Sequence, residues 1–269
     1  MVIIKSKDNS VVKQIAKLNK SSKFRRESKL FIAEGLRIVN DAIENSVDID
    51  FLVLSESAVN KYSDFYKQIT DMGYKHYIFS DDLFMKVTDT KTPQGVLGAI
   101  KLLDKNALFG TIKGDEKFVA LENIQDPGNM GTIFRTAEAI GINGIIMTKD
   151  CCDIYSPKVV RSTMGAIFRM PFIIVESIND FICNNKINSY AAVVDSSATK
   201  IVDVSFTKPC VCVIGNEGNG LTMETINSCT ESVTIPMIGR AESLNASVAA
   251  SIFMWEMMKW IKILFIEFG

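Results

Sequence analysis

Residues 118–147 read FVALENIQDPGNMGTIFRTAEAIGINGIIM, and this stretch decides the fold. It opens with Phe118–Leu121, a continuous apolar run of the kind that forms a parallel strand buried on both faces. A turn at Pro127 leads into a helical stripe of apolar residues, which Gly141 is predicted to end as a C-cap. A second apolar run, Gly144–Met147, completes a predicted strand–helix–strand unit.

The same alternation continues to the C-terminus. A helix is predicted to start at Ser156-Pro157, because proline is favoured at the first helical position. Strands that alternate with helices predict an α/β domain over residues 117–269, with a parallel sheet covered by helices on both sides. The further strands are predicted at Pro171–Val175, Tyr190–Val194, Val211–Ile214 and Ser232–Ile235.

A smaller α/β unit is predicted over residues 1–103. A chain of 269 residues favours about two domains, which agrees with this division. An amphipathic basic helix is expected around Ile15, and a single helix is expected over Val59–Met72. The polar stretch 104–116 is the predicted linker between the two domains.

The charge of the chain is unevenly distributed. The formal net charge is −1, yet residues 1–40 contain ten lysines and arginines against three acidic residues. A basic region on an acidic remainder indicates a surface that binds a polyanion. The alternative is an ordinary solvated helix face.

The composition argues against several classes of protein. Six cysteines are too few for a disulfide scaffold, and their spacing suits no zinc site. The single histidine, His76, has no nucleophile motif near it, so a Ser-His-Asp site is not expected. The longest uncharged run near the C-terminus, Ala246–Trp255, has ten residues and is too short to span a bilayer. We therefore expect no metal site, no signal peptide and no membrane span, and a cytoplasmic location.

The loops that follow the apolar runs form the candidate site, because ligands of parallel α/β sheets bind beyond the carboxyl ends of the strands. The first loop, Glu122–Gly131, leads into a helix on which Arg135 lies off the apolar stripe. We expect Arg135 near the helix N-terminus, where the helix dipole disfavours a cation unless an anion such as a phosphate pairs with it. The alternative is an exposed arginine without a ligand.

The second and third loops have different signals. Gly215–Leu221 contains glycines at relative positions 0, 3 and 5, whereas the dinucleotide fingerprint requires 0, 2 and 5. A nucleotide-dependent oxidoreductase is therefore disfavoured, although the bare backbone still suits a flat or anionic ligand. In the third loop, Ile235–Ser247, either Ser243 or Asn245 is predicted to cap the long helix that follows.

Together, the three loops resemble the signature motifs of the SpoU (TrmH-like) branch of the SPOUT RNA 2′-O-ribose methyltransferases. Three motifs in one order are more specific than any one of them, and the single departure is Ala246, where the family commonly has valine. The matching segments are NIQDPGN at 123–129 with RTA at 135–137, IGNEGNG at 214–220, and IPM at 235–237 with SLN at 243–245.

The N-terminal part also resembles a domain of this family. FIAEGLR at 31–37 and TPQGV at 92–96 are similar to the substrate-binding domain that precedes the catalytic domain in many members. That domain is similar to small ribosomal RNA-binding proteins.

The resemblance implies a fold, a cofactor and an assembly. The fold is a parallel sheet whose C-terminal segment threads a loop to form a deep trefoil knot. The resemblance also implies that S-adenosyl-L-methionine binds in the knot, and that the enzyme is a homodimer with the C-terminal helix near the interface. The implied cofactor contacts are Gly215, Ile235, Leu244 and Asn245, and the implied catalytic residues are Arg135, Asn123, Glu217, Ser243 and Asn245.

The predicted reaction is methyl transfer from S-adenosyl-L-methionine to a ribose 2′-hydroxyl of RNA. Because arginine stays protonated in proteins, we expect Arg135 to hold the target phosphate and stabilise oxyanion charge, with Glu217 orienting Arg135 or accepting the proton. The N-terminal domain favours ribosomal RNA over transfer RNA, and the remaining alternative is a non-catalytic RNA-binding or ribosome-assembly module. The residues expected to contact RNA phosphates are Lys13, Lys17, Lys23, Arg25, Arg26 and Arg37.

Overall fold

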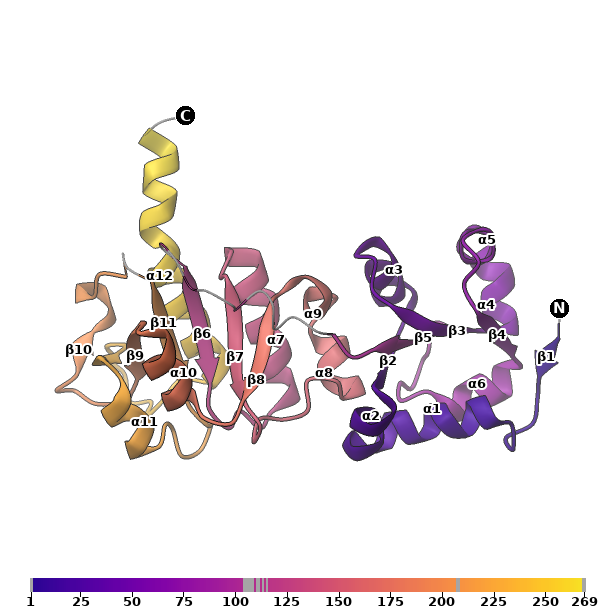
Figure 1. Cartoon of the computed structure of the whole chain (residues 1–269), viewed down its shortest axis with the longest axis horizontal. Helices are drawn as coiled ribbons and strands as arrows, with labels where there is room; N and C mark the ends of the chain where they lie inside the picture. The colour runs from indigo at the N-terminus through magenta and orange to yellow at the C-terminus, as the bar shows by residue number, and fades with distance from the viewer. Residues whose placement is uncertain are drawn as a thin grey trace. The chain divides into compact units, whose positions relative to one another are not determined.

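The computed structural model describes residues 2–103, 109, 112, 114, 116–206 and 209–267, with side chains described up to residue 259. The chain divides into two compact units (Figure 1). Unit 1 comprises Met1–Leu103 and Asp153–Phe168, and unit 2 comprises Asp104–Cys152 and Arg169–Gly269. The predicted linker over 104–116 lies mostly outside the described residues. Within the described part of the chain, no helix is long and apolar enough to cross a bilayer.

Unit 1 is built on a five-stranded mixed sheet with the strand order β1-β4-β3-β5-β2. β5 pairs antiparallel with β2 and β3, whereas β4 is parallel to β1 and β3. The strands are β1 (Ile3–Ile4), β2 (Leu30–Glu34), β3 (Ile49–Ser55), β4 (His76–Phe79) and β5 (Val96–Lys101). The helices are α1 (Ser10–Lys20), α2 (Ser22–Ser28), α3 (Leu36–Glu44), α4 (Glu56–Lys61), α5 (Ser63–Asp71), α6 (Asp81–Val87) and α8 (Pro157–Ser162).

The segment Asp153–Phe168 belongs to unit 1, whereas the division made from the sequence places it in the 117–269 domain. The ring of Tyr155 lies 5.0 Å from the ring of Phe31, and its hydroxyl donates a hydrogen bond of 3.2 Å to the carbonyl of Leu103. α8 packs against β2, which is an edge strand of the sheet. The segment therefore covers a sheet edge that would otherwise expose unpaired backbone groups.

The basic helix predicted near the N-terminus is present as α1. Asn9 caps it, because its side chain accepts a hydrogen bond of 2.9 Å from the backbone of Val11. Ile15 and Leu18 are fully buried, which confirms the predicted apolar face.

Arg25 is not available to RNA, and that prediction was wrong. Its side chain is 5% exposed and forms an ion pair of 2.6 Å with Asp153. Its guanidinium also donates to the carbonyl of Leu18 at 2.5 Å. A charge run in the sequence does not reveal which cation turns inward, because the acidic partner lies 128 residues away.

Replacing Arg25 with alanine is expected to destabilise the protein. Removal of one partner of a buried ion pair leaves the other charge uncompensated, which costs about 3–5 kcal/mol of folding free energy. Because Asp153 is partly exposed, we expect a loss near the lower limit of this range. Urea unfolding of the full chain measures the loss. Arg26→Ala, in an exposed neighbour, is the control and is expected to change the free energy of unfolding by about 0.5 kcal/mol at most. Equal stability of both variants would contradict the structural role of Arg25.

The other cations of the basic region face solvent. Lys13 lies 3.5 Å from Asp8 and Lys23 lies 3.8 Å from Glu27, and exposed pairs of this kind contribute little. The exposed residues among the predicted RNA contacts are Lys13, Lys17, Lys23, Arg26 and Arg37.

The single helix predicted over Val59–Met72 is two helices, α4 and α5, separated at Tyr62. The backbone of Tyr62 has φ −119° and ψ 50°, outside the helical region. In one continuous helix Val59 and Phe65 would lie about 120° apart around the axis. The break at Tyr62 allows both of these apolar side chains to be buried.

Unit 2 contains a seven-stranded sheet with the order β10-β12-β9-β11-β6-β7-β8, and every pairing in it is parallel. The strands are β6 (Lys117–Leu121), β7 (Gly144–Thr148), β8 (Phe172–Val175), β9 (Asn188–Ala192), β10 (Thr199–Lys200), β11 (Cys210–Ile214) and β12 (Glu231–Thr234). The helices are α7 (Pro127–Ile140), α10 (Ile178–Asn185), α11 (Met223–Ser228) and α12 (Ala246–Glu267), with a 3-10 turn at Ile201–Asp203; α9 (Ala166–Arg169) lies where the chain enters this unit.

Helices cover both faces of the unit 2 sheet, as predicted. α7 and α12 pack together and contact β6, β7 and β11, whereas α10 contacts α11 and β7. Phe118 and Ala120 of β6 face a core shared with α10. Val119 and Leu121 point to the opposite face and are also buried, which explains the continuous apolar run. Gly141, with φ 90°, ends α7 in the left-handed conformation predicted for its C-cap.

Candidate active site

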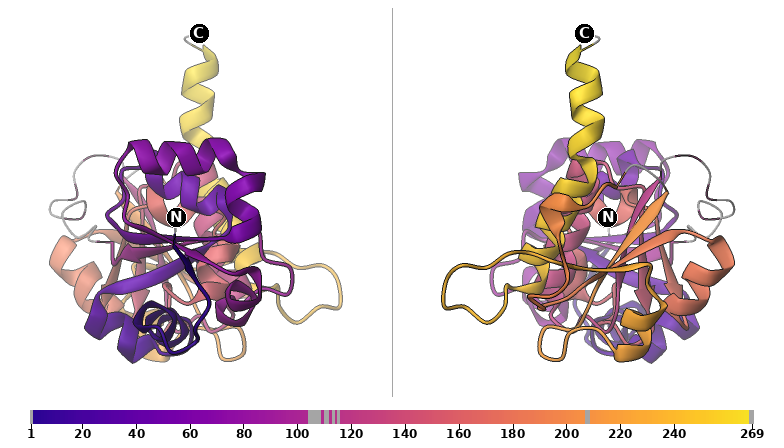
Figure 2. Two further views of the ribbon diagram at one scale, coloured as in Figure 1. Left: turned by 90° about the vertical axis from the view of Figure 1, so that its right-hand side faces the viewer. Right: turned by 90° about the vertical axis from the view of Figure 1, so that its left-hand side faces the viewer.

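The three candidate loops leave the same edge of the unit 2 sheet. They follow the carboxyl ends of β6, β11 and β12, and the carboxyl ends of parallel strands lie at one edge. The loop after β12 extends away from the body of unit 2 before it returns to α12, and Ile238 in this loop is fully exposed (Figure 2).

Asn129 joins the three loops through its side chain. It is the third residue of α7 and is buried, with 7% of its surface exposed. Its amide nitrogen donates a hydrogen bond of 2.9 Å to Oε1 of Glu217, in the second loop. Its amide oxygen accepts a hydrogen bond of 2.9 Å from Asn245, in the third loop. Asn129 was not predicted as a site residue from the sequence; the available signal was a polar side chain at the start of an otherwise apolar helix.

Glu217 organises the first loop. Its carboxylate accepts hydrogen bonds from the backbone of Gln125 at 3.1 Å and of Asp126 at 3.0 Å, in addition to the bond from Asn129. Burial raises the pKa of Glu217, but these hydrogen bonds outweigh that effect and the net pKa is lowered. The carboxylate is therefore ionised at neutral pH, and these bonds weaken only as the pH falls through the lowered pKa.

Of the two roles predicted for Glu217, the structure does not support the one in which it orients Arg135. Among the described residues, no hydrogen bond or ion pair joins the two side chains. Arg135 is the ninth of the 14 residues of α7, so it is not near the helix N-terminus as predicted. It is exposed and lies about 9 Å along the helix axis from Asn129. The helix dipole is therefore no reason to expect a bound anion beside Arg135.

Asn245 is the cap of α12, which settles the choice between Ser243 and Asn245. Its side-chain oxygen accepts hydrogen bonds from the backbone of Ser247 at 2.9 Å and of Val248 at 3.3 Å. The same oxygen also accepts a bond of 2.7 Å from the hydroxyl of Ser247. Ser243 is exposed and lies on the wall of a cavity.

Asn123 meets the second loop through its backbone. It has φ 56°, a left-handed conformation that asparagine tolerates better than most residues. Its carbonyl accepts a hydrogen bond of 2.8 Å from Asn216, and its side-chain oxygen accepts one of 2.5 Å from Gln125. The left-handed backbone conformation favours asparagine at this position, and the side chain does not contact Asn129 or Asn245 among the described contacts.

A cavity of about 570 Å³ opens between the second and third loops. Cavities of this size hold small molecules. Three acidic side chains, Asp195, Glu217 and Glu242, contribute to the wall. The predicted site residues in its wall are Gly215, Glu217, Ser243 and Leu244.

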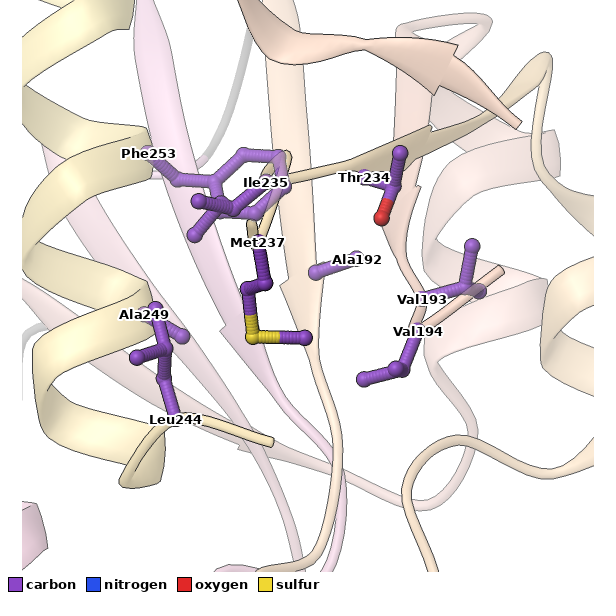
Figure 3. A pocket seen from close by; sticks show the side chains of 9 residues that line it. All are labelled: Ala192, Val193, Val194, Thr234, Ile235, Met237, Leu244, Ala249 and Phe253. Atoms are coloured by element: carbon purple, nitrogen blue, oxygen red, sulfur yellow. The ribbon is translucent and has the colours of Figure 1, made fainter. Parts of the chain in front are cut away.

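An apolar pocket of about 70 Å³ adjoins this cavity and shares Ala192, Val193, Val194, Leu244 and Ala249 with it. In Figure 3 the side chain of Met237 lies between the segment from α12 and the segment after β9. Ile235, another predicted cofactor contact, lines this pocket, whereas Asn245 lines neither the pocket nor the cavity. Thr234 and Phe253 also line the pocket.

The residues around the cavity fit S-adenosyl-L-methionine. At Gly215 a Cβ atom would lie 2.3 Å from the backbone carbon of Gly220, so only glycine lets the two strands of this loop approach. The apolar pocket suits a flat ring, and the acidic wall suits a molecule with a cationic sulfonium and an amino group.

Other chemistries find no support in the described residues. No group of three His, Cys, Asp or Glu side chains is placed to bind a metal ion within that part of the chain. Burial raises the pKa of the Cys151 thiol, and it raises the pKa of Cys229 to about 11. Neither thiol is therefore activated as a nucleophile.

A parallel sheet with three joined loops and a cavity at its carboxyl edge defines an α/β protein that binds a small cofactor. The chain belongs to the SpoU rRNA Methylase family, whose model matches residues 116–255. Residues 9–98 match the MRM3-like substrate binding domain. These matches confirm the resemblance inferred from the three motifs.

Known proteins resemble the chain over nearly its whole length. It is 27% identical to the 23S rRNA (guanosine(2553)-2′-O)-methyltransferase RlmP of Bacillus subtilis, covering 94% of this chain and 98% of that protein. The AdoMet-bound rRNA methyltransferase of Sinorhizobium meliloti is 30% identical with a TM-score of 0.86, covering 97% of this chain and 98% of that one. AviRb of Streptomyces viridochromogenes in complex with AdoMet is 26% identical with a TM-score of 0.85, covering 94% and 98%.

The comparisons confirm the predicted fold class, enzyme class and cofactor. The protein is an α/β RNA 2′-O-methyltransferase of the SpoU family with a preceding smaller domain, and it depends on S-adenosyl-L-methionine.

Proposed function

We propose that the protein methylates a ribose 2′-hydroxyl of ribosomal RNA. The observation that carries this proposal is the side chain of Asn129, which joins the three motif loops beside the cavity. The relatives named as 23S rRNA methyltransferases support ribosomal RNA over transfer RNA. The match to a substrate-binding domain supports an enzyme over a non-catalytic module that only keeps the fold.

We propose that Gly215, Ile235 and Leu244 hold the cofactor, with Asn245 fixing the start of α12 beside it. The cofactor supplies an activated methyl group on a sulfonium. The chain aligns the ribose oxygen with that methyl group and keeps water away, which are the main contributions a protein makes to such a transfer. Asn129 and Glu217 hold the three loops in the geometry that this alignment requires.

Binding calorimetry of the purified protein tests the cofactor site. We expect a saturable heat with one S-adenosyl-L-methionine per chain. An absence of binding under conditions where the protein is folded would contradict the proposed function.

We propose that Arg135 binds the phosphate of the target nucleotide. Arg135→Lys is expected to lower the rate of methyl transfer about 10- to 100-fold, because lysine cannot grip a phosphate with two parallel hydrogen bonds. The measurement is methyl incorporation from labelled cofactor into RNA, with cofactor affinity as the control. Full activity of the lysine variant would contradict bidentate phosphate binding.

We propose that the exposed cations of unit 1 bind RNA phosphates. The triple variant Lys13→Ala, Lys17→Ala, Lys23→Ala is expected to weaken RNA binding and to reduce the slope of log affinity against log salt by about 2–3. A salt titration of RNA affinity measures this slope. Lys101→Ala is the control, because Lys101 already pairs with Asp48 at 2.7 Å. An unchanged slope in the triple variant would show that the three lysines do not contact RNA phosphates and only form a solvated helix face.

We propose that the enzyme is a cytoplasmic homodimer with a trefoil knot, as the family resemblance implies. Trp255 and Val248 of α12 are about half exposed and line a surface with Thr132 of α7, and exposed tryptophan is typical of interfaces. Arg135 lies one helical turn after Thr132, so a dimer formed through this surface would bring Arg135 to the subunit boundary.

The proposal of a knot is supported by Ile235 and Leu244, which line one pocket with the residues that follow β9.

A further inference from the structure

Glu122, the residue after β6, accepts three hydrogen bonds through its side chain, and none of them involves a residue of the proposed catalytic or cofactor site. Its Oε2 accepts from the backbone of Thr222 at 2.8 Å. Its Oε1 accepts from the hydroxyl of Thr222 at 3.0 Å and from the hydroxyl of Thr225 at 2.5 Å. Thr225 is 2% exposed, so its hydroxyl relies on a partner within the protein.

These bonds fix the far end of the glycine-rich loop. Thr222 is the N-cap of α11 and directly follows the loop Gly215–Leu221. The near end of the loop is also tied to Glu122, because the backbone N–H of Glu122 donates to the carbonyl of Ile214 at 2.9 Å. One residue of the first loop therefore anchors both ends of the second loop.

The side chains of Glu122 and Glu217 connect the two loops, and each accepts hydrogen bonds from the segment that carries the other. Glu122 belongs to the first loop and binds Thr222, which follows the second loop. Glu217 belongs to the second loop and binds the backbone of Gln125 and Asp126 in the first. Two carboxylates thus lock the loops together.

The two carboxylates act on different parts of the site. Glu217 continues through Asn129 to Asn245 in the third loop. Glu122 reaches neither of these residues among the described contacts, and its bonds end on the segment that carries Gly215 in the cavity wall. We propose that Glu122 is a positioning residue that holds the glycine-rich loop in the shape that binds S-adenosyl-L-methionine. This inference rests on the proposed function.

The variant Glu122→Gln tests the inference. Glutamine keeps the size of the side chain, but its amide nitrogen cannot accept the bonds that a carboxylate oxygen accepts. The dissociation constant for S-adenosyl-L-methionine, measured by calorimetry, is expected to rise about tenfold, which is the lower range for a lost bond to a charged group. The rate of methyl transfer at saturating cofactor is expected to stay within about twofold of the wild type.

The matched control is Glu224→Gln, the same substitution on the exposed surface of α11. Glu224 interacts with Asn179 and not with the loop, so its cofactor affinity is expected to stay unchanged. A second pair of variants addresses the case in which Glu122→Gln fails to fold. Thr225→Val removes one donor and is expected to weaken cofactor binding, whereas Thr225→Ser keeps the hydroxyl and is expected to restore it.

Several results would overturn the inference. One is an unchanged cofactor affinity in Glu122→Gln, or in Thr225→Val if Glu122→Gln does not fold. If the melting temperature falls while the affinity stays unchanged, Glu122 only stabilises α11. Another is a loss of transfer rate without a loss of cofactor affinity. Failure of the wild-type protein to bind S-adenosyl-L-methionine is a separate outcome, because it would overturn the proposed function itself.

Discussion

Alanine at Gly215 is expected to reduce the affinity for S-adenosyl-L-methionine about 100-fold or more. The added Cβ would lie 2.3 Å from the carbon of Gly220, 2.4 Å from the nitrogen of Leu221 and 2.5 Å from the oxygen of Gly220. All three are backbone atoms, so the loop itself must move, and overpacking of this kind costs about 1–3 kcal/mol or more. Because the loop forms part of the cavity wall, that displacement changes the shape of the site. Calorimetry with the cofactor measures the effect.

Gly239→Ala is the matched control for this prediction. A Cβ at Gly239 would meet no atom within 4 Å, although the residue also lies in a motif loop. We expect its affinity for the cofactor to equal that of the wild type. Equal affinity in Gly215→Ala would show that the loop tolerates the side chain and that Gly215 does not shape the site.

Asn129→Ala is expected to lower methyl transfer by about 100-fold or more. The substitution removes the donor to Glu217 and the acceptor for Asn245, so the third loop loses its connection to the first two. Displacements of about 1 Å at a reacting centre reduce rates by roughly two orders of magnitude. Single-turnover transfer to RNA at saturating cofactor measures the chemical step separately from binding.

A control variant separates the role of Asn129 from a general effect of losing an amide. Asn185→Ala removes a local hydrogen bond to the carbonyl of Phe181 on α10, and we expect it to leave the transfer rate unchanged. A wild-type single-turnover rate in Asn129→Ala would contradict the joining role assigned to this residue. Circular dichroism of both variants verifies that each is folded.

Much of the fold followed from local patterns in the sequence. The run Phe118–Leu121 is apolar because both faces of β6 are covered, and Gly141 follows α7 because its φ of 90° favours glycine. The break of the predicted helix at Tyr62 was not predictable, since no proline or glycine marks it. It results from the burial of Val59 and Phe65, which is a property of the packed unit.

The candidate site was only partly predictable for a related reason. Sequence motifs identified the loops that carry Gly215, Glu217 and Asn245, but they do not state which side chains touch. Asn129 lay inside the first motif and was passed over, because its importance rests on partners 88 and 116 residues away. Arg25 was misassigned for the same reason, since its partner Asp153 is equally remote in sequence.

The most direct test of the function is a map of ribose methylation in total RNA from cells with and without this protein. The proposed function predicts one or a few ribosomal RNA positions whose 2′-O-methyl group is present only when the protein is present. The same positions should remain unmethylated when the Asn129→Ala variant replaces the wild type. Identical methylation maps with and without the protein would contradict the assignment of ribosomal RNA ribose as its substrate.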